Sequence, residues 1–125
     1  MDVVNIQAQY GISASASSNQ VTSWVEPSGA TWGSGVLTVA NRNRIKAIRI
    51  AVIARNAKVE QSSVSSLCSS TTVANPSGVC AWDGSAFAAP LVDLHYADAN
   101  WDQYRYRVFE TTIPLRNVIW SKDTL

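Results

Sequence analysis

The segment from Ile45 to Arg55 constrains the fold of this chain more than any other. It is rich in isoleucine and valine, whose β-branched side chains are stiff and favour extended backbone. A helical reading would align Ile45, Ile48 and Val52 on one side. A strand reading gives one continuous apolar face and one mixed face. The apolar face consists of Ile48, Ile50, Val52 and Ala54. The β-branched density favours the strand.

Two further segments alternate with a period of two, as half-buried strands do. Residues 3–10 place Val4, Ile6, Ala8 and Tyr10 on one face, and Gly11 is expected to end that strand. Residues 104–113 alternate again, and Pro114 stops or bulges the pairing because it lacks an N–H.

The shorter elements are less regular. We expect a returning strand at Val21–Val25, one or two helical turns within Val36–Arg44, a short strand at Leu91–Tyr96 and a short strand or extended tail after Leu115. Irregular loops separate the strong segments, and there is no alternation of strands with helices. The sequence therefore predicts an α+β, mainly β fold with a mostly antiparallel sheet and few or no long helices.

The two cysteines, Cys68 and Cys80, lie in a stretch rich in serine and threonine, and their spacing is not that of a redox motif. A zinc site would need more ligands, and His95 is the single histidine. We predict a disulfide that holds the long loop together, with two unpaired buried thiols as the alternative. The segment closed between the two cysteines is short, and closing a ring of that length stabilises a fold by about 3 kcal/mol. A disulfide also predicts an oxidising compartment.

Length and composition limit the possible classes of protein. With 125 residues, 46% hydrophobic, we expect a single globular domain over residues 1–125. The formal net charge is +1 without a basic stripe, so no nucleic-acid partner is expected. An oxidised protein without an export signal or an apolar spanning segment is best interpreted as a fragment of a longer one.

One cluster, Asp93, His95 and Asp98, could form a metal or acid–base site. In a strand, Asp93 and His95 would share a face. We interpret the cluster as solvated surface. There is no serine elbow motif and no glycine-rich phosphate loop, so we predict no catalytic, cofactor or metal site and no enzymatic activity.

The tryptophans and arginines have two interpretations each. Trp24, Trp32, Trp82, Trp101 and Trp120 either fill a small core or form a sugar-binding platform; packing is favoured, with Trp101 as the exception because its neighbours are polar. Two pairs of arginines either form solvated sheet faces or contact a partner, which would be another subunit or, weakly, DNA. These pairs are Arg105 with Arg107 and Arg49 with Arg55.

Three stretches together resemble the PilW family of type IV pilus minor pilins. Val3–Gly11 is similar to the family's VVNLQAQYG strand, and Ile45–Arg55 to its aVRiallaR strand. Tyr104–Trp120 is similar to its closing YRYRvfetviPLRNmiW signature. The stretch between Ala57 and Trp101 carries the resemblance only loosely.

This resemblance implies a pilin-like head, related to the J-type pseudopilins of type II secretion. The family's N-terminal membrane helix is absent here, so we expect the C-terminal part of a head whose full-length form is anchored in the inner membrane and then enters the pilus. The implied function is pilus assembly at the filament tip, with other minor pilins and the major pilin as partners. Trp101, Arg105 and Arg107 are candidate partner contacts, and the loop from Cys68 to Cys80 a candidate contact with host molecules. The alternative is an adhesin or carbohydrate-binding module.

Overall fold

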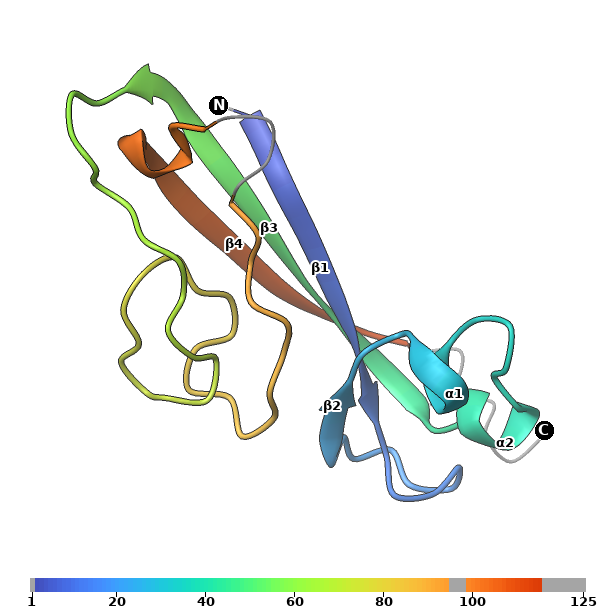
Figure 1. The fold of residues 1–125 in the computed structure, drawn as a ribbon. Helices are drawn as coiled ribbons and strands as arrows, with labels where there is room; N and C mark the ends of the chain where they lie inside the picture. The colour runs from blue at the N-terminus through green and yellow to red at the C-terminus, as the bar shows by residue number, and fades with distance from the viewer. Residues whose placement is uncertain (1, 95–98, 116–125) are drawn as a thin grey trace. The chain divides into compact units, whose positions relative to one another are not determined.

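The computed structural model describes residues 2–94 and 99–115 (Figure 1). These described residues form four strands, two helices of one turn each and a 3-10 turn. In chain order these are β1 (Asp2–Ile12), β2 (Ser23–Val25), α1 (Gly29–Trp32), α2 (Val39–Arg42), β3 (Ile45–Val59), η1 (Trp101–Gln103) and β4 (Tyr104–Pro114). The strands form an antiparallel sheet in the order β2-β1-β3-β4. The predicted mainly β fold is confirmed.

The contacts group the chain into two compact units, and the long strands β1 and β3 contribute residues to both. We call Met1–Gln7 with Ala51–Glu110 the disulfide unit, and Ala8–Ile50 with Thr111–Leu125 the hairpin unit.

The core of the disulfide unit lies between β3 and the long loop that follows it. Ala51 and Ile53 of β3 are fully buried against residues of that loop. The loop residues are Ala81, Trp82, Val92 and Leu94, and half-buried side chains pack around them, including Tyr106 and Val108 of β4. A loop without regular structure thus supplies one side of this core, where many domains would use a helix.

In the hairpin unit, β2 returns antiparallel to the end of β1, with Gly11 opposite Trp24. A side chain at Gly11 would place its Cβ 2.8 Å from the Trp24 ring, so only glycine lets the ring lie against the strand. The expectation that Gly11 ends the strand is wrong, because β1 continues to Ile12. The glycine is there for close packing and not for a turn.

Ile45–Arg55 is a strand, as predicted, and it extends to Val59. The continuous apolar face is not the more deeply buried one. Ile48, Ile50 and Val52 are only half-buried, although Ala54 at the end of that face is buried, and most of the mixed face is buried. Its buried members are Ile45, Ala47, Arg49, Ala51 and Ile53. An arginine can occupy a buried face because partners from other strands satisfy its guanidinium.

In β1 the alternation also fails to predict burial. Gln9, which lies opposite the apolar face in the alternating pattern, has no exposed surface, whereas Ile6 of the apolar face is 66% exposed. The predicted returning strand, the helical turn within Val36–Arg44 and the strand over 104–113 are all confirmed. Leu91–Leu94 forms no strand. The rest of that predicted strand and the tail after Leu115 lie outside the described residues.

Candidate functional site

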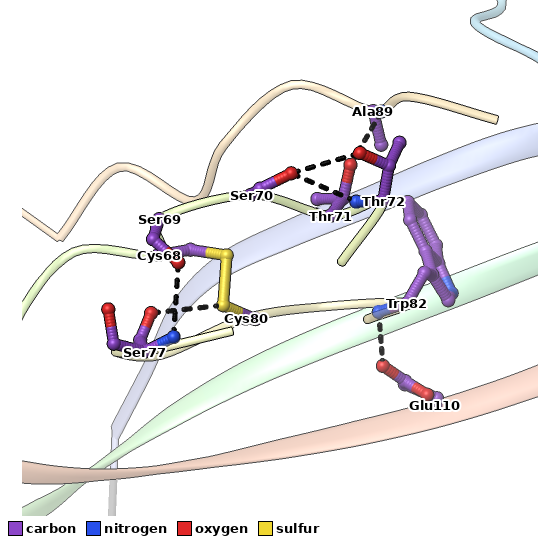
Figure 2. Close-up of a disulfide and its surroundings, with 10 residues drawn as sticks. All are labelled: Cys68, Ser69, Ser70, Thr71, Thr72, Ser77, Cys80, Trp82, Ala89 and Glu110. Atoms are coloured by element: carbon purple, nitrogen blue, oxygen red, sulfur yellow. Dashed lines mark hydrogen bonds between the residues drawn. A yellow bond between two sulfur atoms is a disulfide. The ribbon is translucent and has the colours of Figure 1, made fainter. Parts of the chain in front are cut away.

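The disulfide joins Cys68 to Cys80, with 4.9 Å between their Cα atoms, which confirms the predicted pairing (Figure 2). Inside the staple, the Ser69 N–H donates to the Ser77 carbonyl and the Ser77 N–H donates to Ser69 Oγ, each at 3.0 Å. Serines of this low-complexity stretch therefore supply hydrogen bonds within the loop.

Gly78 allows the two arms of the loop to meet. It has a left-handed φ of +88°, and a Cβ there would lie 2.1 Å from the carbonyl oxygen of Leu67. The arms form an isolated bridge between Leu67 and Val79, and the Val79 N–H donates to Ser66 at 3.0 Å. No residue with a side chain fits at position 78 without moving the main chain.

Past the staple, the chain is fixed to the sheet of the disulfide unit. The main-chain N–H of Trp82 donates to a carboxylate oxygen of Glu110 on β4 at 2.6 Å (Figure 2). Trp82 itself has a left-handed φ of 57° and a buried ring. Buried Thr71 accepts a hydrogen bond from the Ala89 N–H at 3.2 Å. Together these bonds hold an irregular loop in one conformation.

The outer surface of this loop is partly apolar. Its large exposed side chains are Val64, Leu67, Val73, Phe87 and Leu91. The backbone that carries them is held by the disulfide and by hydrogen bonds, so presenting them to a partner would cost little conformational entropy. A surface of this kind suits a protein contact.

A second surface lies on β4, where Arg105 and Arg107 are exposed on the side away from the core. A hollow of about 300 Å³ is lined by Asn56, Arg105, Tyr106 and Arg107. Arg105 pairs with Glu60 at 3.3 Å. Sequence reasoning identified the two arginines but missed Asn56 and Glu60, because nothing in the sequence shows that the end of β3 lies beside the start of β4.

The other arginine pair, Arg49 and Arg55, does not form a solvated face, so the first of its two interpretations is wrong. Arg49 is 7% exposed; it donates to Gln9 Oε1 from Nε at 2.9 Å and from a terminal nitrogen, and stacks on Trp24 at 4.7 Å from the ring centroid. Arg55 lies over Tyr104, 4.1 Å from the ring centroid, and 3.8 Å from Asp2. Both guanidinium groups are occupied within the fold.

The tryptophans within the described residues are used for packing. Trp82 belongs to the core, and Trp24 and Trp32 lie under Arg49 and Arg44. Trp101 is half-buried against the same core, and its carbonyl accepts a hydrogen bond from the Tyr106 hydroxyl at 2.6 Å. Its role as a partner contact stays a prediction. Trp120 lies outside the described residues.

In the predicted acidic and histidine cluster, Asp93 is exposed, and His95 and Asp98 lie outside the described residues. Among residues 2–94 and 99–115, no three metal-ligating side chains come together. The described helices are all too short or too polar to span a membrane.

Comparison with known families gives one clear result. The family model described as PilW, type IV pilus-assembly protein W, matches residues 1–117. No curated protein and no solved structure matches the chain significantly. The matched region includes all four strands and the stapled loop. This chain therefore belongs to the PilW family and has a role in type IV pilus assembly.

Proposed function

We propose that this chain is the head of a minor pilin, which helps to start filament assembly at the tip by packing against neighbouring pilins. The family match over residues 1–117 is the observation that carries this proposal. In the full-length protein, a membrane helix would precede the head and hold it on the periplasmic side before it enters the pilus. The partners would be the other minor pilins and the major pilin.

The surface chemistry supports a packing role. The disulfide unit presents a stapled loop with exposed apolar side chains, and its β4 strand presents exposed arginines. Both cysteines are bonded to each other, and the Glu110 carboxylate accepts the Trp82 N–H. These groups stabilise the fold, and we propose no catalytic role for them.

A measurement of stoichiometry and position tests the proposal. Pili sheared from cells would be purified, and this protein would be quantified by mass spectrometry relative to the major pilin. The proposal predicts one or a few copies in each filament, with gold-labelled antibody at a single end. Labelling along the whole filament, or absence of the protein from intact filaments, would contradict it.

A further inference from the structure

Within the disulfide unit, β4 is an edge strand. The strand order places β3 on one side of it and no described strand on the other. From Arg107 to Glu110, its main chain makes no hydrogen bond to a described residue outside the sheet. An extended edge of this kind is a template on which another chain can add a strand.

The side chains at this edge have an unbalanced charge. Arg105 and Arg107 lie two positions apart, so both point to the face opposite the core residues Tyr106 and Val108. Glu60 neutralises Arg105, but Arg107 has no hydrogen bond or ion pair within the described parts of the chain. The hollow between the arginines is about 300 Å³, which is enough space for a carboxylate side chain.

The same face continues toward an apolar residue. Phe109 follows Arg107 by two positions and is 49% exposed. Along one face, the edge therefore presents two guanidinium groups and then an aromatic ring. The complementary strand would carry carboxylates opposite the arginines and an apolar side chain opposite Phe109.

We propose that β4 accepts an extended acidic segment of another pilin as an added strand, with one of its carboxylates in the hollow beside Arg107. Main-chain hydrogen bonds would provide the affinity, and the two arginines and Phe109 would fix the register. The identity of the partner as a pilin rests on the function proposed above. The edge and its charges are independent of that function.

Peptides test the edge directly. We would titrate ¹⁵N-labelled protein with a capped peptide in which every second residue is threonine and the residues between are, in order, glutamate, glutamate and leucine. The control is a matched peptide in which lysine replaces each glutamate. The proposal predicts that the glutamate peptide alone slows hydrogen exchange of the β4 amides between Arg107 and Glu110. Equal binding of both peptides, or unchanged exchange at these amides, would overturn it.

Arginine variants then test the charge. Arg107→Gln should weaken binding of the glutamate peptide by about tenfold, as expected for the loss of a charge-assisted hydrogen bond. Arg107→Lys should retain part of the binding, and Arg42→Gln, an exposed arginine of α2, should retain all of it. Since Arg107 is exposed, its variants should have the same melting temperature as the parent protein. Undiminished peptide binding by Arg107→Gln would refute the assigned role.

Pilus counts separate the two proposals. If cells lacking the protein have few pili and the Arg107→Gln protein fails to restore them while Arg42→Gln succeeds, both proposals are supported. If Arg107→Gln restores pili fully, the added strand is wrong and the assembly function stands. If cells lacking the protein have normal pili, the assembly function is wrong, and the peptide titration alone decides what binds the β4 edge.

Discussion

Opening the disulfide between Cys68 and Cys80 is expected to destabilise the disulfide unit by an amount that follows from the loop length. The cysteines are 12 positions apart. Closing a loop of that length removes about 9–10 cal/mol/K of entropy from the unfolded chain, or about 3 kcal/mol at 25 °C. This is a large part of the stability of a small domain.

Urea denaturation of the native protein, with and without dithiothreitol, measures the effect. With an m-value of about 2 kcal/mol/M, reduction should lower the midpoint by roughly 1.5 M. Reduction leaves both side chains in place, so a loss of packing does not contribute. A Cys68→Ala and Cys80→Ala double variant should have the lower midpoint in both buffers.

Hydrogen exchange locates the effect within the unit. The amides of Val79 and Trp82 are bonded to Ser66 and Glu110, so they should exchange faster after reduction. Amides around Gly11 in the hairpin unit should change much less. A reduced protein that keeps its midpoint within about 0.3 M would show that the staple stabilises little, and the loop-closure reasoning would be refuted.

Three further substitutions test other parts of the structure by the same denaturation assay. Gly78→Ala should lower the free energy of unfolding by about 2 kcal/mol because of the positive φ and the 2.1 Å approach of a carbonyl oxygen to the new Cβ. Gly35→Ala, with open space around it, should leave the stability unchanged. Equal losses for the two variants would contradict this. Gln9→Ala should lower the free energy of unfolding by about 3 kcal/mol because buried Arg49 loses the hydrogen bonds that Gln9 Oε1 accepts, and adding Arg49→Met should recover part of that loss. An unchanged stability of Gln9→Ala would show that the pair contributes little. Ile53→Ala should cost about 3 kcal/mol through the cavity it leaves in the core, and a loss below about 1 kcal/mol would place this side chain outside the core.

The existence of the long strands could be predicted from the sequence, but their buried faces could not. Alternation and β-branched density are local signals, so Ile45–Arg55 and residues 104–113 were predicted as strands. Burial depends on partners that are distant in sequence. Arg49 is buried because Gln9, 40 positions away, accepts its hydrogen bonds, and no local pattern encodes that pairing.

The candidate site shows the same division. The disulfide could be predicted because two cysteines in a small chain have few alternatives, and the exposed arginines could be predicted from alternation in β4. The packing of Trp82 against β3 could not, since the loop that carries it has no periodicity. For the same reason the expected strand at Leu91–Leu94 is absent, although Val92 and Leu94 are buried as a strand's inner face would be.

Counting surface pili by electron microscopy tests the central claim most directly. Cells that lack this protein would be compared with cells in which the full-length protein is restored, with the cellular pool of major pilin measured by immunoblot in both. A role in assembly predicts few or no pili without the protein, an unchanged pilin pool, and normal pili on restoration. Normal numbers of pili in its absence would contradict the account.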